Sequence, residues 1–189
     1  MERTWSEPAS TGLWRAVRWY SARRFGTVLE PARVMAHQPR VLKAYLDYER
    51  AAQKWDRVDP ALKHLAVMAA AATVGCSWCI DFSYWASQDR GVPLDKARAL
   101  PRWREADCFS ELERLVIEYA DAMSSTPAVV DDGLVEKLSQ HLEEDQLVEL
   151  TAAIALETIR SRTNRAFGLA SQGFSDRCEL APTPEAQPA

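Results

Sequence analysis

The chain has 189 residues, of which 47% are hydrophobic and 26% are charged, and its formal net charge at pH 7 is -4. This composition suits one folded domain with a substantial core, and the negative charge argues against general nucleic-acid binding. The longest apolar run, Leu65 to Val74, is much shorter than the ~18 residues of a membrane span. Seven tryptophans predict large aromatic surfaces, either in the core or between subunits.

The first residues, Met1 to Pro8, are polar and mixed in charge, unlike a secretory signal. The next segment, Trp14 to Tyr20, is basic and aromatic. A membrane-surface helix has this pattern, but we favour an N-terminal helix that packs its aromatic face on the domain. Two of the four cysteines form a CxxC motif and two, Cys108 and Cys178, are scattered. This usage differs from a secreted disulfide framework and predicts a cytoplasmic protein with no membrane partner.

Helical signals recur along nearly the whole chain, and no segment has the pattern of a strand. The pair Asp59-Pro60 predicts the start of a helix that runs to Val74 and is ended by Gly75. A second helix is expected from about Cys76 to Arg90, before Gly91-Val92-Pro93. Further helices are expected over Pro31–Ala36, Arg40–Trp55, Leu94–Leu100, Ser110–Met123, Asp131–His141 and Glu144–Gly168. We therefore predict an all-α, single-domain fold in which the helices on either side of Gly75 form an antiparallel hairpin.

Cys76 and Cys79 stand at the start of the second helix of this hairpin. Two thiols three residues apart in a helical turn share a face and can close into a disulfide and reopen. Zinc would need about four ligands, and a thioredoxin-like site would need βαβ units; the sequence shows neither. The motif is therefore interpreted either as the centre of a helical thiol enzyme, with no metal and no cofactor, or as an inert pair.

A proton carrier for these thiols is suggested by the geometry of the predicted hairpin. Reflection about the turn at Gly75 places His64 opposite residue 85, and therefore near Ser83 on the thiol face. A histidine beside a cysteine can accept its proton and stabilise the thiolate. The alternative is that His64 is an ordinary capped or solvated helix residue. The charged run Glu157, Arg160, Arg162 and Arg165 is interpreted as a solvated or inter-subunit face.

The segments Leu62-Lys63-His64-Leu65-Ala66-Val67 and Gly75-Cys76-Ser77-Trp78-Cys79-Ile80-Asp81-Phe82 resemble the carboxymuconolactone decarboxylase superfamily, in its alkylhydroperoxidase D-like branch. The resemblance spans about residues 25 to 175. The family motif is a Glu, eleven residues, CxxC, three residues and a His. Here His64 stands at the Glu position and Ser83 at the His position, so both relay residues differ.

The resemblance implies a thiol-dependent oxidoreductase that reduces a peroxide or disulfide substrate through Cys76 and Cys79. An external dithiol would reduce the resulting disulfide, and we favour Cys79 as the sulfur that reacts with peroxide and Cys76 as the exchange site. His64 with Ser83 would replace the family relay; Asp81, turned away from Cys79, is expected to have a structural role. The altered relay keeps a second hypothesis open, in which the chain is a catalytically weak helical oligomer that senses redox state or binds a partner.

The expected organisation is an N-terminal helical extension over residues 1–24, the alkylhydroperoxidase D-like domain over 25–175, and a disordered tail over 176–189. The family is oligomeric, and the aromatic and Ala-rich helices predict buried surface between subunits. We therefore expect a homo-oligomer. The aromatic residues that follow the motif, Trp78, Phe82, Tyr84 and Trp85, are expected in core or interface packing rather than in a substrate channel.

Overall fold

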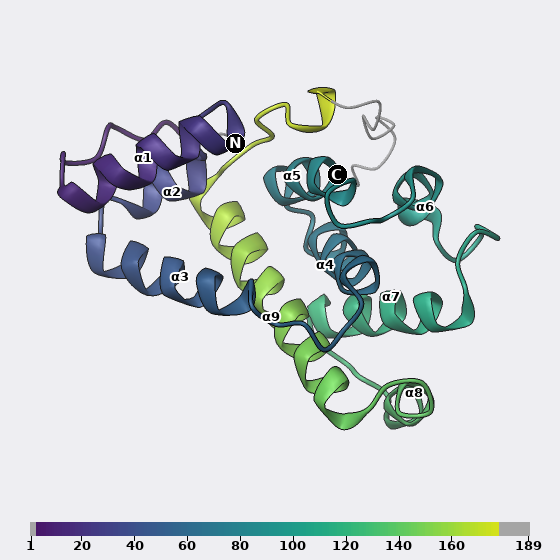
Figure 1. Ribbon diagram of the computed structural model, residues 1–189. Coiled ribbons are helices and arrows are strands. Elements are labelled where there is room, and N and C mark those ends of the chain that lie inside the picture. The colour runs from purple at the N-terminus through teal and green to yellow at the C-terminus, as the bar shows by residue number, and fades with distance from the viewer. Residues whose placement is uncertain (1–2, 178–189) are drawn as a thin grey trace. The chain divides into compact units, whose positions relative to one another are not determined.

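The computed structural model describes residues 3–177, and all regular structure within this range is helical (Figure 1). Two short 3-10 helices, η1 (Leu100–Arg102) and η2 (Ser175–Arg177), accompany the α-helices. The α-helices are α1 (Gly12–Phe25), α2 (Glu30–Met35), α3 (Pro39–Ala52), α4 (Pro60–Val74), α5 (Ser77–Ser87), α6 (Leu94–Ala99), α7 (Glu111–Ser124), α8 (Asp132–Leu138) and α9 (Glu144–Phe167). The predicted all-α class is confirmed. Within the same range, no helix is both long enough and apolar enough to cross a membrane.

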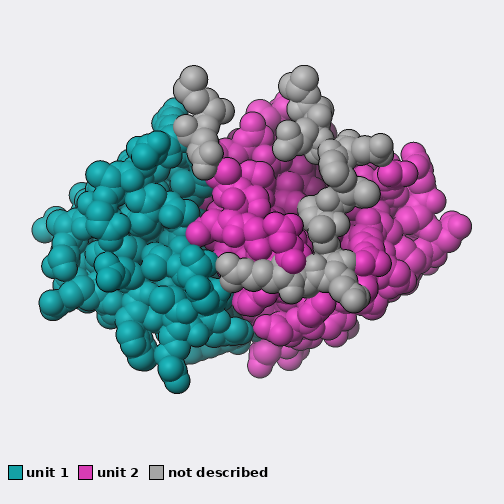
Figure 2. All heavy atoms as spheres, turned by 90° about the horizontal axis from the view of Figure 1, so that it is seen from above, with its two compact units in different colours: residues 1–55, 166–169 teal, residues 56–165, 170–189 magenta. Residues whose placement is uncertain are grey.

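The chain divides into two compact units, coloured separately in Figure 2. Of the described residues, unit 1 holds 3–55 and 166–169, and unit 2 holds 56–165 and 170–177. The expected boundary after residue 24 would fall within α1 and stays a prediction. Helix α1 groups with α2 and α3 because its buried Trp14 packs with Met35, Ala36 and Leu42. Of the predicted tail, residues 176 and 177 belong to η2 and the rest lies outside the described residues.

The core of unit 2 is built around α4, which packs against α5 and α7. Fully buried apolar side chains of α4, such as Leu65 and Met68, lie in one cluster with Val116 and Ile117 of α7 and with Ile154 of α9. Burial of this kind is worth roughly 1.5–3 kcal/mol for each large side chain. The cluster therefore fixes the helix that leads into the CxxC motif.

The hairpin of α4 and α5 forms as the sequence predicts. The carboxylate of Asp59 accepts a hydrogen bond from the backbone N–H of Leu62 at 2.9 Å, and Pro60 occupies the first turn. Gly75 ends α4 with a φ of 72°, a left-handed conformation that disfavours any residue with a Cβ. A Cβ there would also lie 3.0 Å from Nη1 of Arg165. Gly75 thus permits both the turn and the close approach of α9.

Polar pairs along α9 hold this long helix against the rest of unit 2. The Glu149 carboxylate accepts hydrogen bonds from the backbone N–H groups of Arg57 and Val58, and its Oε1 lies 2.6 Å from Nζ of Lys63. Burial alone would raise the pKa of Glu149, but these partners outweigh burial and hold it below its ordinary value. Further along, Thr151 bonds Tyr119 and Thr158 bonds Ser124 of α7. These contacts set the rotation of α9 and therefore decide which side chains its C-terminal half presents to α5.

Candidate active site around the Cys76–Cys79 pair

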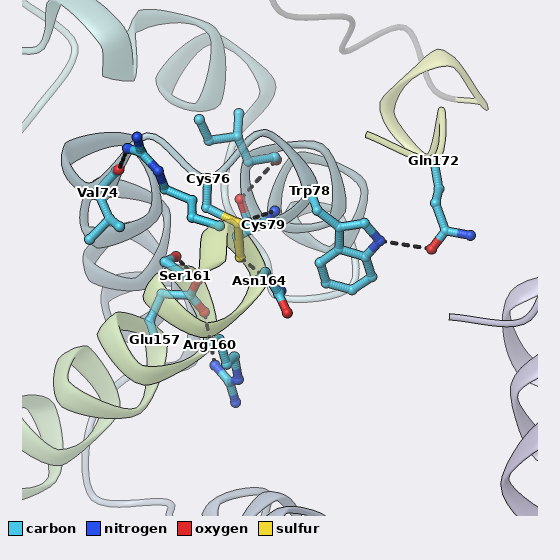
Figure 3. Close-up of a disulfide and its surroundings, with 12 residues drawn as sticks. Val74, Cys76, Trp78, Cys79, Glu157, Arg160, Ser161, Asn164 and Gln172 are labelled. Atoms are coloured by element: carbon cyan, nitrogen blue, oxygen red, sulfur yellow. Dashed lines mark hydrogen bonds and ion pairs between the residues drawn. A yellow bond between two sulfur atoms is a disulfide. The ribbon is translucent and has the colours of Figure 1, made fainter. Parts of the chain in front are cut away.

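Cys76 and Cys79 form a disulfide at the start of α5, with their Cα atoms 5.2 Å apart (Figure 3). Cys76 is the N-cap residue, and its Sγ accepts a hydrogen bond from the backbone N–H of Cys79 at 3.2 Å. Cys76 is 0% exposed and Cys79 is 4% exposed. The pair is therefore positioned as the sequence predicts, but both sulfurs are covered. Cys108 is a half-buried free thiol, and Cys178 lies outside the described residues.

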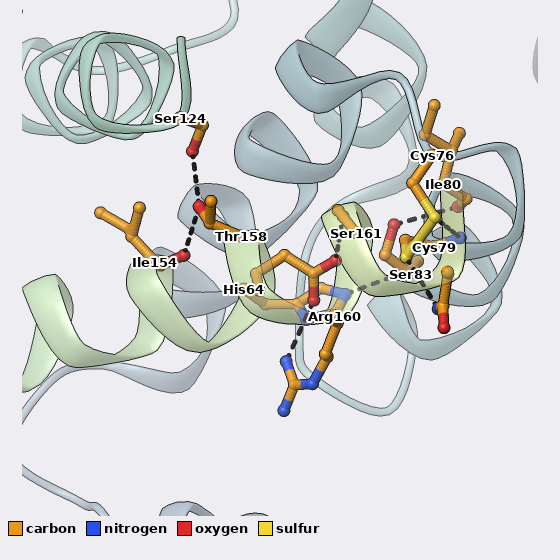
Figure 4. Close-up of polar contacts among 12 residues, drawn as sticks. His64, Cys76, Cys79, Ile80, Ser83, Ser124, Ile154, Thr158, Arg160 and Ser161 are labelled. Carbon is orange, nitrogen blue, oxygen red and sulfur yellow. Dashed lines mark hydrogen bonds and ion pairs between the residues drawn. A yellow bond between two sulfur atoms is a disulfide. The ribbon is translucent and has the colours of Figure 1, made fainter. Parts of the chain in front are cut away.

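His64 and Ser83 meet, as the hairpin predicts, but not through the Ser83 hydroxyl. Nε2 of His64 lies 2.9 Å from the backbone carbonyl oxygen of Ser83, and the Ser83 hydroxyl donates to the carbonyl of Ile80 at 3.0 Å (Figure 4). A bond to a carbonyl requires the proton on Nε2 and leaves only Nδ1 as an acceptor. Within residues 3–177, neither side chain makes a hydrogen bond to a cysteine. This contact joins α4 to α5 and forms no direct relay to sulfur.

The protonation of His64 also differs from the expected role. The pKa of His64 is lowered to about 4, mainly by burial and also by the charges of Arg90 and Arg160, while the hydrogen bond to the Ser83 carbonyl opposes the shift. An imidazole with this pKa is neutral at pH 7 and is a weak base. The imidazolium that the sequence reasoning invoked to hold a thiolate is therefore disfavoured at this position.

A different set of polar side chains reaches the disulfide from α9. Nδ2 of Asn164 donates to Sγ of Cys79 at 3.3 Å (Figure 3). One turn earlier, the Ser161 hydroxyl donates to Oε1 of Glu157 at 2.8 Å, and Oε2 of Glu157 lies 3.0 Å from Nη1 of Arg160. We call Glu157, Ser161 and Asn164 the α9 column, because their spacing puts them on one helical face.

All three members of the α9 column are buried: Glu157 is 4% exposed, Ser161 0% and Asn164 1%. Oδ1 of Asn164 is buried and has no hydrogen-bond partner among the described residues. Unsatisfied buried polar atoms are rare in folded proteins and often mark places of function or of ligand entry. The column therefore combines an acid, a hydroxyl and an amide, and the amide contacts the Cys79 sulfur.

Sequence reasoning missed this column and assigned Glu157 to a solvated or inter-subunit face, which is wrong because the side chain is buried in unit 2. A signal was present in the periodicity of α9. The polar residues continue, at helical spacing, the buried apolar stripe that contains Leu150 and Ile154. Polar side chains in phase with a core stripe indicate a buried polar site.

Asp81 lies two residues beyond Cys79 and has the structural role that the sequence predicted. Its carboxylate accepts hydrogen bonds from the backbone N–H groups of Gln172, Phe174 and Ser175 at 2.7–3.0 Å, and from the Ser175 hydroxyl at 2.7 Å. Burial works to raise the pKa of Asp81, but the Ser175 and Phe174 donors outweigh it, and the pKa is lowered. This carboxylate holds the segment after α9 against α5.

The aromatic residues of α5 pack with the same segment. The Trp78 and Phe82 rings stack with their centroids 5.0 Å apart, and Phe82 meets Phe174 edge to face at 5.2 Å. Nε1 of Trp78 donates to Oε1 of Gln172 at 2.7 Å. This arrangement agrees with the core-packing interpretation.

Within the described part of the chain, no cluster of three or more His, Cys, Asp or Glu side chains is suited to hold a metal ion.

Comparison with known proteins agrees with this architecture. Residues 39–122 match the model of the carboxymuconolactone decarboxylase family. The uncharacterized protein YnjA of Escherichia coli (strain K12) is 33% identical over 163 residues, which cover 85% of this chain and 88% of that protein.

Solved structures share the fold at lower identity. The crystal structure of the alkylhydroperoxidase AhpD core of a peroxidase-related protein from Ralstonia eutropha JMP134 has a TM-score of 0.78 at 18% identity, over 90% of this chain and 93% of that one. The apo structure of the debrominase Bmp8 has a TM-score of 0.80 at 20% identity, over 93% of this chain and 96% of that one. The chain therefore belongs to the carboxymuconolactone decarboxylase family.

Proposed function

We propose that the protein is a thiol-dependent oxidoreductase that reduces peroxides or disulfides through Cys76 and Cys79. The observation that carries this proposal is the disulfide at the start of α5 with a buried acid, hydroxyl and amide beside it. A helix start stabilises a thiolate because its free N–H groups and dipole favour negative charge. The family and the peroxidase-related structural neighbour agree with this chemistry.

In the peroxide reaction, the thiolate of Cys79 attacks one oxygen of a peroxide ROOH. The S–O bond forms, the O–O bond breaks, and the leaving alkoxide takes a proton to become ROH. The thiolate of Cys76 then attacks the sulfenic acid of Cys79 and expels hydroxide, which is protonated to water. An external dithiol reduces the disulfide and is itself oxidised to a disulfide. The contact of Asn164 supports Cys79 as the first nucleophile, because the Asn164 amide donates a hydrogen bond to the Cys79 sulfur.

Both the deprotonation of Cys79 and the protonation of the alkoxide need a proton carrier. In this proposal the Glu157 carboxylate, which accepts the Ser161 hydroxyl at 2.8 Å, takes up the Cys79 proton through Ser161 and returns it to the alkoxide by the same route. A hydroxyl can do this because it both donates and accepts. His64 and Ser83 act as positioning residues, since their contact joins α4 to α5 beside the motif.

The test is peroxide consumption by reduced protein with dithiothreitol as the reductant. Wild type is expected to lose two thiols per equivalent of hydrogen peroxide and to turn over. With one equivalent of hydrogen peroxide and no dithiothreitol, Cys76→Ser is expected to stop at a sulfenic acid on Cys79, which a dimedone label detects, and Cys79→Ser is expected to give no label. Cys108→Ser is the matched control and should behave as wild type. Slow loss of thiols with no sulfenic acid would instead favour the catalytically weak sensor or partner-binding protein.

A homo-oligomer is part of the same proposal. Several large apolar side chains of unit 1 are exposed, including Trp19 at 67%, Tyr20 at 57% and Val41 at 52%. Large apolar surfaces of this kind favour association between copies. Light scattering at micromolar protein concentration should give a mass above the 21.3 kDa of one chain, and a monomer mass would contradict the proposal.

A further inference from the structure

A polar pocket of about 550 Å³ lies next to the Gly75 turn. Its walls include Val74 of α4, the segment 124–126, and Arg162 and Arg165 of α9. All of these residues belong to unit 2. The two arginines are three residues apart on α9, so their side chains leave the same face of the helix.

The two guanidinium groups of this pocket face neutral oxygens only. Nη2 of Arg162 donates to the hydroxyl of Thr126 at 2.8 Å and to the carbonyls of Ser124 and Ser125 at 3.3 and 3.4 Å. Nη1 of Arg165 donates to the Val74 carbonyl. Neither arginine forms an ion pair with a carboxylate of the described residues. Each guanidinium has five N–H donors, and only one nitrogen of each is used.

Like charges three residues apart repel each other unless an anion lies between them. Asp121 accepts a hydrogen bond from the hydroxyl of Thr73, which lines the pocket, at 2.7 Å and is paired with Arg104 at 2.7 Å. The charge of Asp121 is thus largely balanced by Arg104, outside the pocket. The pocket therefore carries an excess of positive charge with the planar donor geometry that suits carboxylates and phosphates.

The pocket adjoins the redox motif through the backbone. Arg165 bonds the Val74 carbonyl, and the Cα of Gly75 lies so close that an added Cβ would be 3.0 Å from Nη1 of Arg165. Cys76 follows Gly75 directly and is 0% exposed. An anion that draws Arg165 away from Val74 would loosen the turn that directly precedes Cys76.

We propose that this pocket binds the carboxylate or phosphate group of a small thiol that reduces the Cys76–Cys79 disulfide. The proposal deepens the proposed function and rests on it. The thiolate RS⁻ attacks Sγ of Cys76, an S–S bond forms, and the Cys79 thiolate leaves. A second RS⁻ attacks the sulfur of the bound ligand, which releases RSSR and the Cys76 thiolate. Two thiols are oxidised to one disulfide, and the protein pair gains two electrons.

The test compares thiols that differ only in the anionic group. Phosphopantetheine is paired with pantetheine, and N-acetylcysteine with its amide, and the rate of disulfide reduction is corrected for the thiolate fraction of each thiol. In wild type, at least one anionic thiol is expected to react about tenfold faster than its neutral partner, which corresponds to about 1.4 kcal/mol. Whichever pair shows the preference identifies phosphate or carboxylate as the preferred group.

Arg162→Gln with Arg165→Gln should abolish this preference, and Arg162→Gln alone should weaken it. Arg57→Gln is the matched control for the single variant, because it removes one positive charge from an exposed side chain. Arg57 pairs with Asp145 at the other end of α9, roughly 25 Å along the helix from Arg162 at about 1.5 Å per residue. The control should keep the preference of wild type, and equal preferences in wild type and the double variant would overturn the inference.

S-methylated phosphopantetheine and S-methylated N-acetylcysteine separate the pocket from the redox chemistry, because neither can reduce a disulfide. Calorimetry should detect binding of the preferred one to wild type and to Arg57→Gln, but not to the double variant. If a probe binds but no thiol reduces the disulfide, anion binding in the pocket would be supported and the proposed function would be contradicted. Reduction without charge preference, together with no binding of either probe, would contradict the pocket alone.

Discussion

Two buried polar regions of unit 2 lie beside α5, and they differ in how completely their groups are satisfied. The carboxylate of Asp81 accepts four hydrogen bonds from the segment that follows α9. In the α9 column, Asn164 donates to Cys79 while its Oδ1 has no partner among the described residues. A carboxylate whose hydrogen bonds are all made stabilises the fold, since replacing it leaves its buried donors without an acceptor and lowers stability. An incompletely satisfied column beside a sulfur retains capacity for a substrate or a proton.

The largest effect is expected at Glu157. The change Glu157→Gln keeps the size of the side chain and an acceptor for Ser161, but it removes the proton carrier. Peroxide turnover should fall by about 100-fold or more, because general acid–base catalysis contributes roughly 10²–10⁴. Steady-state assays with hydrogen peroxide measure this. Turnover equal to wild type would mean that protons exchange directly with solvent and that the column is structural, like Asp81.

Asp81 should show the opposite behaviour. Asp81→Ala leaves the donors of Gln172, Phe174 and Ser175 without their acceptor, so the free energy of unfolding should fall by about 3 kcal/mol. Urea denaturation measures the loss, and turnover per folded molecule should stay close to wild type. Because the pKa of Asp81 is lowered in the fold, its stabilisation is present above the unfolded pKa near 3.8 and is lost as the pH falls through the lower folded pKa. A large fall in turnover with unchanged stability would contradict the assignment.

The third prediction concerns His64, a buried polar group beside α5 that we expect to be neutral at pH 7 and to have little effect on thiol reactivity. Its pKa is lowered from 6.5 to about 4, so the unfolded chain takes up a proton at a higher pH than the folded chain. Wild type should therefore lose up to about 3 kcal/mol of stability as the pH falls from 7 towards 4. His64→Gln should show a flatter pH dependence, with alkylation of the reduced motif at pH 7 changed less than about threefold. A rise of the thiol pKa by a full unit in His64→Gln would restore His64 as the proton carrier.

The smallest effect is expected at Asn164. In a Cys76→Ser background, Asn164→Ala removes one N–H donor from the Cys79 sulfur. The thiolate loses a single weak bond, so the pKa of Cys79 should rise by less than about one unit, with a few-fold slower alkylation near neutral pH. The pH profile of iodoacetamide labelling measures this shift. An unchanged profile would indicate that the amide contacts sulfur only in the disulfide state.

The sequence predicted the elements best where local chemistry sets their ends. Asp59 and Gly75 delimit α4 as expected, Ser110 caps α7 with Glu113 in a capping box, and Cys76 begins the next helix. These features depend on residues only a few positions apart, so a single sequence is enough to recognise them.

The parts that could not be predicted depend on distant contacts. Asn164 reaches Cys79 across 85 positions, and the rotation of α9 that makes this possible depends on Glu149 and its partners near Arg57. Motif spacing pointed to His64 as the proton carrier, but its neutral state follows from burial, which no local pattern reveals. The grouping of α1 with α2 and α3 likewise depends on where Trp14 is buried.

The helix cap of α5 is itself a sulfur. Sγ of Cys76 accepts the backbone N–H of Cys79 at 3.2 Å while it is bonded to the Cys79 sulfur. A thiolate is a stronger acceptor than a disulfide sulfur, because hydrogen bonds to charged groups are stronger. A Cys76 thiolate is therefore expected to strengthen this capping hydrogen bond. Backbone amide exchange at Cys79 is then expected to differ between the oxidised and the reduced protein.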